Sequence, residues 1–290
     1  MSNLAVPVSS SGSMLLGVMG DPIAHSKSPV MHQAALRQTG IPGDYVRLHI
    51  TADQLGEAIL SIRTLGFRGV NVTVPHKVKV MAFLDEIDPA AAAVGAVNTI
   101  VNNNGRLTGY NTDGIGYIRS LKEEAVPELS GKTVVVLGAG GAARGVIHAL
   151  LTEGPRTVIV ANRTKETASK LCEEWQKLGS LEACSLEELS EWVPQADVVI
   201  NTTSVGMSPR IEESPLDTSL LPGGTVVSDL IYNPLKTRLL REAELRGCRI
   251  HSGLGMFVYQ GAYAFEYWTG QPAPIPAMRN AVLEQLDGQE

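Results

Sequence analysis

The sequence is poor in features that mark several protein classes. Its 290 residues include only three cysteines, Cys172, Cys184 and Cys248, and none stands in a CxxC pair. No Cys and His cluster has metal-ligand spacing, and an odd number of widely spaced cysteines argues against a disulfide framework in a chain this long. We therefore predict buried or partly buried reduced thiols and no bound metal.

Basic segments and long apolar runs are also missing. Lys and Arg number 24 against 30 Asp and Glu, and no stretch concentrates the basic residues that a nucleic-acid surface needs. No run reaches the roughly 18 apolar residues that span a bilayer, and no basic residue precedes the apolar start as in a secretory signal. We expect no nucleic-acid or membrane partner, a cytoplasmic location, and a flexible leader over the first dozen residues.

What the chain does contain is an alternation of short apolar runs and helix-length amphipathic stretches. This alternation predicts an α/β fold with largely parallel strands. In the first part, we expect strands at 14–19, 44–49, 69–74 and 97–101 and helices at 29–39, 52–64, 76–83 and 113–124. In a second series, we expect strands at 132–138, 156–162, 197–202 and 225–230 and helices from Ala142, from Lys165 and at 235–246. Two closing helices are expected at about 255–268 and 275–286.

The organisation of these elements predicts two α/β domains. The turn-rich segment VPELSGK (126–132) precedes the second series and places a boundary within 114–131. Because the second series does not need the two closing helices, we expect them to pack on the first domain. The prediction is a discontinuous substrate domain, residues 1–113 plus 253–290, and a Rossmann-type nucleotide domain, residues 114–252.

A glycine-rich turn lies between the run VVVL and an apolar-patterned helix. Its residues are Gly138, Ala139, Gly140, Gly141, Ala142 and Ala143. This is the dinucleotide-binding pattern GxGxxA with a strand before it and a helix after it. Gly138 would permit the tight turn, Gly140 would let the backbone approach a pyrophosphate, and the helix N-terminus would attract the phosphates. The alternative is a glycine-rich turn that binds nothing.

The end of the next strand bears on which nucleotide is bound. An NAD site normally has Asp or Glu there for the ribose diol, whereas this strand ends in Asn162, Arg163 and Thr164. Arg163 can pair with a 2′-phosphate and stack beside adenine, and Thr164 can add a hydroxyl and cap the following helix. The sequence therefore predicts NADP, unless Arg163 and Thr164 are only surface and cap residues.

Four other segments place polar residues at strand ends. They are HSKSP (25–29), NVTVPHK (71–77), AVNT (96–99) and NTDG (111–114). Ser26 and Ser28 can grip one anionic group, and Ser28 also fits a helix N-cap followed by proline. Pro75 ends its strand, so Lys77 lies at a strand-to-helix corner, a usual place for chemistry in α/β folds. Each segment has a plain turn or cap interpretation, but their recurrence in one domain favours a site.

The motifs GDPIAHSKSP, NVTVPHK, GAVNT, YNTDG, GAGGAARG, ANRT, NTTSVGM and GLGM, with Gln260, resemble the motif series of the shikimate dehydrogenase family in the same order. The resemblance runs from about Gly17 to the end and implies that Lys77 and Asp113 form the catalytic pair. It implies further substrate contacts at Ser26, Ser28, Thr73, Asn98, Tyr232 and Gln260. It implies NADP(H) contacts at Gly138, Ala139, Gly140, Gly141, Ala142, Asn162, Arg163, Thr164, Leu230 and Gly253.

One position departs from the family pattern. The family often carries a second Arg three residues after the Thr of NRT, where this chain has Thr167. Lys165 could substitute for that Arg, but only as a point charge. Lys165 is therefore a further candidate cofactor residue, and we expect a weaker preference for NADP than is usual in the family.

The implied reaction is the reversible reduction of 3-dehydroshikimate to shikimate by NADPH, in the biosynthesis of chorismate and the aromatic amino acids. The nicotinamide would carry the hydride. Lys77 would donate a proton to the carbonyl oxygen and stabilise its developing charge, with Asp113 fixing the ammonium as one coupled unit. His25 and His76 are also candidates for proton transfer, but for His76 packing is the favoured interpretation.

Several alternatives remain open from the sequence. One is a quinate/shikimate dehydrogenase that uses NAD or NADP, and another is a folate-linked dehydrogenase of similar build. A third is a catalytically silent NADP sensor, which would have no reason to keep Lys77, Asp113 and substrate hydroxyl partners. Ser26 and the strand end 162–164 favour the shikimate enzyme. The sequence is compatible with a monomer or a homodimer.

Overall fold

The computed structural model describes residues 12–287, so residues 1–11 of the predicted leader lie outside the described residues. The chain forms two compact units: Met1–Thr112 with Val258–Glu290 is unit 1, and Asp113–Phe257 is unit 2. The second division falls at 258, whereas the sequence placed it at 253. The difference arises because the helix α9 (Leu254–Thr269) runs across that division, which no turn residue marks.

Unit 1 is built on a six-stranded sheet with the order β2-β1-β3-β5-β6-β4. Its strands are β1 (Met14–Gly20), β2 (Gly43–His49), β3 (Gly69–Val72), β4 (Glu86–Ile87), β5 (Thr99–Asn103) and β6 (Arg106–Tyr110). β1 runs parallel to β2 and β3, whereas β5 runs antiparallel to β3 and β6. The β5–β6 hairpin, which the sequence analysis missed, turns at Asn104 and Gly105 with φ of 52° and 92°. An Asn-Gly pair with positive φ suits the tight turn of a hairpin.

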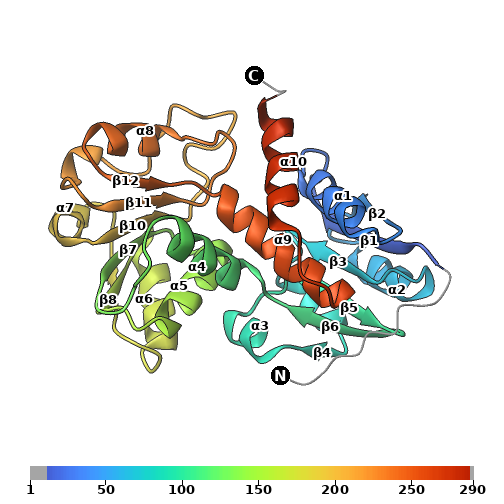
Figure 1. The fold of residues 1–290 in the computed structure, drawn as a ribbon. Helices are drawn as coiled ribbons and strands as arrows, with labels where there is room; N and C mark the ends of the chain where they lie inside the picture. The colour runs from blue at the N-terminus through green and yellow to red at the C-terminus, as the bar shows by residue number, and fades with distance from the viewer. Residues whose placement is uncertain (1–11, 288–290) are drawn as a thin grey trace. The chain divides into compact units, whose positions relative to one another are not determined.

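The helices of unit 1 come from both ends of the chain (Figure 1). They are α1 (Ser28–Thr39), α2 (Leu55–Thr64), α3 (Pro89–Val94), most of α9 and α10 (Ile275–Asp287). Helix α10 packs along α1, and Trp268 of α9 is fully buried and donates from Nε1 to the Ile100 carbonyl at 2.9 Å. The C-terminal helices are thus part of the same core as the first 112 residues.

The helix expected at 76–83 is wrong in its first half. Only Lys79–Phe83 is helical, and it is a 3₁₀ helix. The His76 N–H bonds to the Thr73 carbonyl at 2.9 Å, so the residues after β3 close a turn before helical hydrogen bonding begins. Lys77 therefore lies in a turn rather than on a helix.

Unit 2 is built on a six-stranded, fully parallel sheet with the order β12-β11-β10-β7-β8-β9. Its strands are β7 (Thr133–Leu137), β8 (Thr157–Ala161), β9 (Leu181–Cys184), β10 (Val198–Asn201), β11 (Val226–Asp229) and β12 (Arg249–His251). The strand order reverses between β7 and β10, which is the switch point where doubly wound sheets bind ligands. The α/β fold class predicted from the sequence is confirmed.

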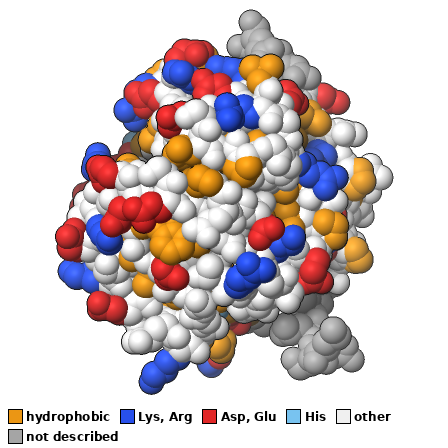
Figure 2. Space-filling model, turned by 90° about the vertical axis from the view of Figure 1, so that its left-hand side faces the viewer, with side chains coloured by type: hydrophobic (Ala, Val, Ile, Leu, Met, Phe, Trp, Pro, Cys, Tyr) orange, Lys and Arg blue, Asp and Glu red, His pale blue; other side chains and the backbone are white. Residues whose placement is uncertain are grey.

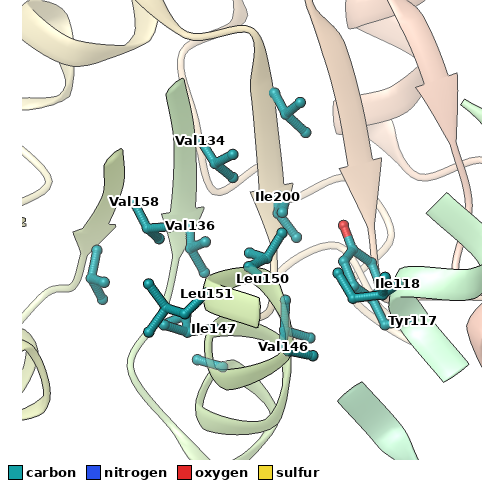
Figure 3. Close-up of a cluster of buried hydrophobic side chains, with 14 of the residues drawn as sticks. Tyr117, Ile118, Val134, Val136, Val146, Ile147, Leu150, Leu151, Val158 and Ile200 are labelled. Atoms are coloured by element: carbon teal, nitrogen blue, oxygen red, sulfur yellow. The ribbon is translucent and has the colours of Figure 1, made fainter. Parts of the chain in front are cut away.

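Both faces of this sheet are covered by helices, which explains why its central strands are apolar over most of their length. The helices are α4 (Asp113–Glu124), α5 (Gly141–Thr152), α6 (Lys165–Trp175), α7 (Leu189–Trp192) and α8 (Arg238–Leu245). Val134, Val136 and Ile200 from the strands pack against Ile147 and Leu150 of α5 (Figure 3). This core holds the loops at the carboxyl ends of the strands in place.

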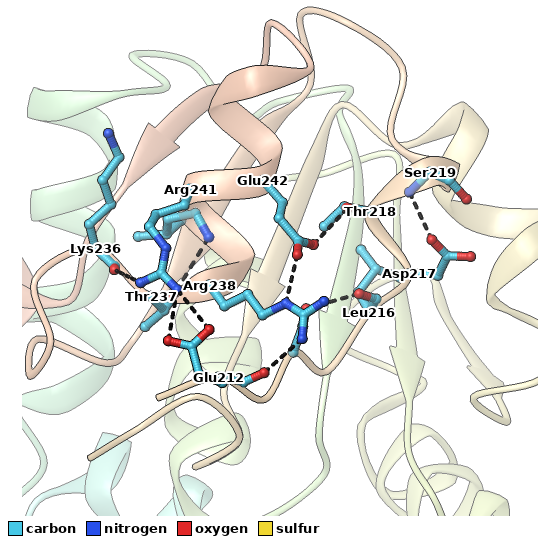
Figure 4. Close-up of polar contacts among 12 residues, drawn as sticks. Glu212, Leu216, Asp217, Thr218, Ser219, Lys236, Thr237, Arg238, Arg241 and Glu242 are labelled. Carbon is cyan, nitrogen blue, oxygen red and sulfur yellow. Dashed lines mark hydrogen bonds and ion pairs between the residues drawn. The ribbon is translucent and has the colours of Figure 1, made fainter. Parts of the chain in front are cut away.

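The loop that follows β10 is fastened to α8 by two arginines (Figure 4). Arg238 donates to the Glu212 carbonyl at 2.8 Å and to the Glu242 carboxylate at 2.6 Å. The Arg241 guanidinium lies 3.4 Å from the Glu212 carboxylate. Exposed pairs of this kind contribute little singly. Together they link α8 to Glu212, which follows the NTTSVGM motif in the chain.

Cys172, Cys184 and Cys248 are free and buried, as predicted. Within residues 12–287, no helix combines the length and apolar character needed to cross a membrane. The same residues hold no group of His, Cys, Asp and Glu side chains that could bind a metal. On the face drawn in Figure 2, acidic and basic side chains lie intermingled.

Candidate active site

Three of the four polar segments predicted from the sequence are joined by hydrogen bonds. The Val97 N–H donates to the Lys77 carbonyl at 2.8 Å. The next residue, Asn98, accepts the Thr112 N–H on Oδ1 and donates from Nδ2 to the Thr112 hydroxyl, both at 2.9 Å. Lys77 and Asn98 are thus tied to the residue that immediately precedes Asp113, the first residue of unit 2. Lys77 and Asp113 are both half-buried.

A buried amide that the sequence analysis did not single out supports this arrangement. Asn71 of β3 donates from Nδ2 to the Asn98 carbonyl at 3.2 Å and to the Thr99 hydroxyl at 3.0 Å. Its Oδ1 accepts the Tyr45 hydroxyl at 2.7 Å. The available signal was its position at the head of NVTVPHK, whereas nothing in the sequence pointed to Tyr45. Asn71 thus connects β2, β3 and the start of β5.

Tyr45, which bonds to Asn71, also packs against a second buried ring. It stacks on His32 of α1 with the ring centroids 4.4 Å apart and the planes 8° apart. Burial raises the pKa of Tyr45 well above its usual value and lowers the pKa of His32 to about 3. Both groups are therefore uncharged at neutral pH. Within the described residues, neither ring nitrogen of the fully buried His32 has a hydrogen-bond partner.

The serine segment leads directly into α1. Ser28 is the first helical residue rather than the N-cap, which is Lys27, so the expected capping by Ser28 is wrong. Ser26 supplies the oxygen instead, because its hydroxyl accepts the Ser28 N–H at 3.3 Å. Arg47 donates to the Ser26 carbonyl at 3.1 and 2.8 Å. Burial, with a smaller contribution from Arg47, lowers the pKa of Lys27.

The remaining candidates in unit 1 lie on elements that meet α1 and β1. The Thr73 N–H bonds to the Met19 carbonyl at 2.9 Å, and Thr73 is half-buried. Gln260 of α9 is half-buried, and its neighbour Gly261 lies so close to α1 that an added Cβ would stand 2.2 Å from the Met31 methyl. His76 is fully buried with Nε2 at 2.6 Å from the Ile50 carbonyl, which fits a packing role.

In unit 2, the glycine-rich turn leaves β7 and enters α5. Gly138 has a φ of 108°, and a Cβ there would lie 2.7 Å from the Thr202 hydroxyl. Side chains added at Gly140 or Gly141 would meet nothing within 4 Å. The exposed turn therefore leaves open space above the N–H groups of the first helical turn, as a bound pyrophosphate requires. Ala139 and Ala143 are buried, and Ala142 is exposed.

The end of β8 presents Asn162, Arg163 and Thr164. Asn162 is half-buried and donates from Nδ2 to the Thr164 carbonyl at 2.9 Å, whereas Arg163 and Thr164 are exposed. Within the described part of the chain, the Arg163 guanidinium makes no ion pair. The capping expected of the Thr164 side chain is wrong, because the Thr167 N–H is taken by the Thr164 carbonyl at 3.0 Å.

Lys165, the cation predicted to stand in for a second arginine, is already paired. Its Nζ lies 2.7 and 2.8 Å from the two carboxylate oxygens of Glu188. Nothing in the sequence pointed to Glu188, which lies 23 residues further along the chain.

The residues predicted near the nicotinamide are also brought together. The Gly253 N–H bonds to the Ile231 carbonyl at 3.1 Å, and a Cβ at Gly253 would lie only 2.0 Å from the Leu230 carbonyl oxygen. Only glycine fits at this position. Tyr232 stacks on Phe257 with the ring centroids 4.5 Å apart, and burial raises its pKa to about 12.

A buried carboxylate, also missed from the sequence, underlies this region. Asp229 accepts hydrogen bonds from Asn201 Nδ2 and the Ile231 N–H, each at 3.0 Å, and from the Thr237 hydroxyl at 2.7 Å. Burial raises its pKa to about 6, while these donors oppose the rise. Asp229 is therefore ionised at neutral pH and fixes the chain that leads from β11 to Tyr232.

A doubly wound nucleotide unit joined in one chain to a mixed α/β unit with a polar, hydrogen-bonded edge defines a two-unit dinucleotide-dependent oxidoreductase. Three family models match successive parts of the chain. The shikimate dehydrogenase substrate binding domain covers residues 18–100, shikimate/quinate 5-dehydrogenase covers 120–222, and the shikimate 5′-dehydrogenase C-terminal domain covers 253–283. The chain belongs to the shikimate dehydrogenase family, and the resemblance predicted from its motifs is confirmed.

Individual relatives match nearly the whole chain. Shikimate dehydrogenase (NADP(+)) of Geobacillus kaustophilus (strain HTA426) is 49% identical over 270 residues, covering 93% of this chain and 98% of that protein. The structure of shikimate 5-dehydrogenase from Thermus thermophilus, in complex with NADP(H) and shikimate, has a TM-score of 0.86 at 40% identity and covers 93% of this chain and 99% of its own. Quinate dehydrogenase from Corynebacterium glutamicum, in complex with NAD, has a TM-score of 0.88 at 32% identity, with 94% and 99% covered.

Proposed function

We propose that this protein catalyses the reversible NADPH-dependent reduction of 3-dehydroshikimate to shikimate, on the route to chorismate and the aromatic amino acids. The observation that carries this proposal is the 49% identity to an NADP-dependent shikimate dehydrogenase across 93% of the chain. The strand end Asn162-Arg163-Thr164 supports it, because it has no acidic residue to repel a 2′-phosphate.

In this proposal NADP(H) binds to unit 2 and supplies the hydride. The turn from Gly138 to Ala142 and the N-terminus of α5 hold the pyrophosphate. Asn162, Arg163 and Thr164 surround the adenosine 2′-phosphate, with Lys165 next to them in its ion pair with Glu188. Leu230 and Gly253 adjoin the nicotinamide. The open space above Gly140 and Gly141 supports the first of these assignments.

The substrate is assigned to hydroxyl and amide side chains. Ser26 and Ser28 bind the ring carboxylate, and the residues assigned to the ring hydroxyls are Thr73, Asn98, Tyr232 and Gln260. Asn98 is 2% exposed and is held on both of its side-chain atoms, so its orientation is fixed before any ligand arrives. Fixed polar groups of this kind favour one arrangement of hydroxyls over another.

Lys77 and Asp113 are the proposed catalytic pair. Lys77 donates a proton to the ketone oxygen as negative charge develops on it, and Asp113 holds the ammonium in place. The two act as one coupled unit. Support comes from the hydrogen bonds that tie Lys77 and Asn98 to Thr112, the residue before Asp113.

A grid of steady-state assays tests the proposal: shikimate and quinate, each with NADP⁺ and NAD⁺. We expect the highest kcat/KM for shikimate with NADP⁺. Equal or better oxidation of quinate with NAD⁺ would favour the second candidate, a quinate/shikimate dehydrogenase. The similarity to the quinate dehydrogenase of Corynebacterium glutamicum is the reason to test this candidate. NADP⁺ binding without oxidation of either acid would identify a sensor.

The proposal also includes a cytoplasmic location and a monomer or homodimer that acts on small molecules, without nucleic-acid or membrane partners. Size-exclusion chromatography with light scattering distinguishes the two oligomeric states.

A further inference from the structure

The loops after β8 and β9 lie side by side at one edge of the nucleotide sheet. The two strands run parallel, with Ala161 opposite Cys184, and the Asn162 N–H bonds to the Cys184 carbonyl at 3.2 Å. The strand end predicted to hold the 2′-phosphate therefore adjoins the segment 185–188. The segment 185–188 is adjacent in space but not in sequence, and it contains two acidic residues, Glu187 and Glu188.

Glu188 is fixed in this position by two contacts. Both of its oxygens accept Lys165 Nζ, at 2.7 and 2.8 Å, and Oε2 also accepts the Ser185 N–H at 2.7 Å. The hydrogen bond from Lys165 and that from the Ser185 N–H lower the pKa of Glu188, while Glu188 raises the pKa of Lys165. Both groups are therefore charged at neutral pH, and each cancels the other.

The pairing changes the charge that a bound nucleotide meets. Lys165 is the cation available where the family often has a second arginine, and its charge is matched by Glu188. Arg163 is exposed and forms no ion pair within residues 12–287. A carboxylate beside this strand end repels a 2′-phosphate, and in NAD sites an acid at such a strand end binds the ribose diol.

We propose that Glu188 is a specificity-determining residue that weakens the preference for NADP over NAD by holding Lys165 in an ion pair, so that Arg163 alone pairs with the 2′-phosphate. This inference rests on the proposed function, because it concerns the cofactor of that same reaction. It makes Lys165 a reserve cation rather than a direct phosphate ligand.

The variant Glu188→Gln tests this directly, since glutamine keeps the size of the side chain and an oxygen for the Ser185 N–H. Removing the negative charge of Glu188 should raise kcat/KM for NADP⁺ about 10-fold and leave kcat/KM for NAD⁺ within about twofold. Glu187→Gln is the matched control. It removes the same charge from the neighbouring residue, whose carboxylate bonds to Ser185 and not to Lys165. It should change either value by less than about twofold.

Lys165→Met separates the two possible roles of the lysine. In the natural chain it should lower kcat/KM for NADP⁺ less than about threefold, whereas in the Glu188→Gln background it should reverse the whole gain. Two results would overturn the inference: an unchanged ratio of NADP⁺ to NAD⁺ activity in Glu188→Gln, or a large loss of NADP⁺ activity from Lys165→Met alone.

Calorimetric Kd values for NADP⁺ and NAD⁺, measured without substrate, give a second readout on the same variants. If the natural chain fails to oxidise shikimate, the proposed function fails, yet these Kd values still support or refute the role of Glu188. If shikimate is oxidised but the ratio of the Kd values for NADP⁺ and NAD⁺ is the same in the natural chain and in Glu188→Gln, the proposed function stands and the role of Glu188 is refuted. Glutamine at position 188 could perturb the 185–188 turn, so Glu188→Ala serves as a second variant without the charge. The melting temperatures of both variants are compared with that of the natural chain.

Discussion

The two units differ in where the residues of their predicted sites lie. In unit 1 the amides and hydroxyls lie inside the sheet, where Asn71, Asn98 and Thr99 bond one another across strands and are at most 6% exposed. In unit 2 the central strands are mostly apolar, and several of the residues predicted to bind the cofactor lie in exposed turns such as 140–142 and 163–165. The site residues of unit 1 are therefore positioned by contacts between side chains, whereas those of the glycine turn in unit 2 are positioned by the backbone.

The strongest test of this comparison is Lys77→Ala in unit 1. If the amine acts only in proton transfer, turnover should fall by about 10³-fold while KM for shikimate changes by less than about threefold. Lys79→Ala, which removes an exposed lysine two residues away, is the control and should have little effect. An equal loss in turnover and substrate affinity would argue against a catalytic role for Lys77.

A smaller effect is expected from Asn71→Ala. Tyr45, Thr99 and the Asn98 carbonyl would lose their shared partner in a buried setting, so the free energy of unfolding should fall by about 3 kcal/mol. Urea titration measures this change. Asn103→Ala removes an exposed amide from the same sheet and should cost less than about 1 kcal/mol. Similar losses in both variants would remove the distinction drawn for unit 1.

Asp229 is one of the buried polar side chains of unit 2, a fully buried carboxylate whose pKa is raised from 3.8 to about 6 by burial. Between these two values the folded protein keeps a proton that the unfolded chain has released. The contribution to stability is therefore present below about pH 4 and is lost as pH rises through about 6, by up to about 3 kcal/mol.

Asp229→Asn should abolish this slope. The measurement is the difference in the free energy of unfolding between the two proteins from about pH 4 to 7. Asp197→Asn, which removes a half-exposed carboxylate paired with Lys132, is the control. A difference that stays constant with pH for Asp229→Asn would show that burial does not raise this pKa.

The smallest effects are expected from two substitutions in the glycine turn, which distinguish a role in stability from a role in cofactor binding. Gly138→Ala forces a side chain into φ 108° against Thr202 and should cost about 2 kcal/mol of stability. Gly140→Ala meets open space, so it should leave the melting temperature unchanged but raise Kd for NADP⁺ if the pyrophosphate approaches there. Loss of stability in both variants would contradict a turn preset by its backbone.

The sequence predicted best what depends on neighbours along the chain. The helix at 113–124 has the predicted bounds, and the glycine turn follows its strand as expected. The strands β9 and β12 were missed because LEAC and RIH are too short and polar to show a strand pattern. Capping by Ser28 was predicted wrongly because Ser28 is already helical and its own N–H bonds to the Ser26 hydroxyl. Capping by the Thr164 side chain was predicted wrongly because the Thr164 carbonyl accepts the Thr167 N–H.

What could not be predicted depends on contacts between distant segments. Asn71 bonds to Tyr45 across 26 positions and to Thr99 across 28. Glu188 reaches Lys165 across 23 positions only because β8 and β9 are adjacent. No local pattern records such neighbours, since they follow from strand order and register.

The close approach of Gly253 to the Leu230 carbonyl oxygen limits how this protein could be redesigned. A library that randomised position 253 would return glycine alone, because even a methyl group would displace the backbone between β11 and Tyr232. Engineering of the pocket expected around the nicotinamide would have to vary the side chain at 230 and leave its partner untouched.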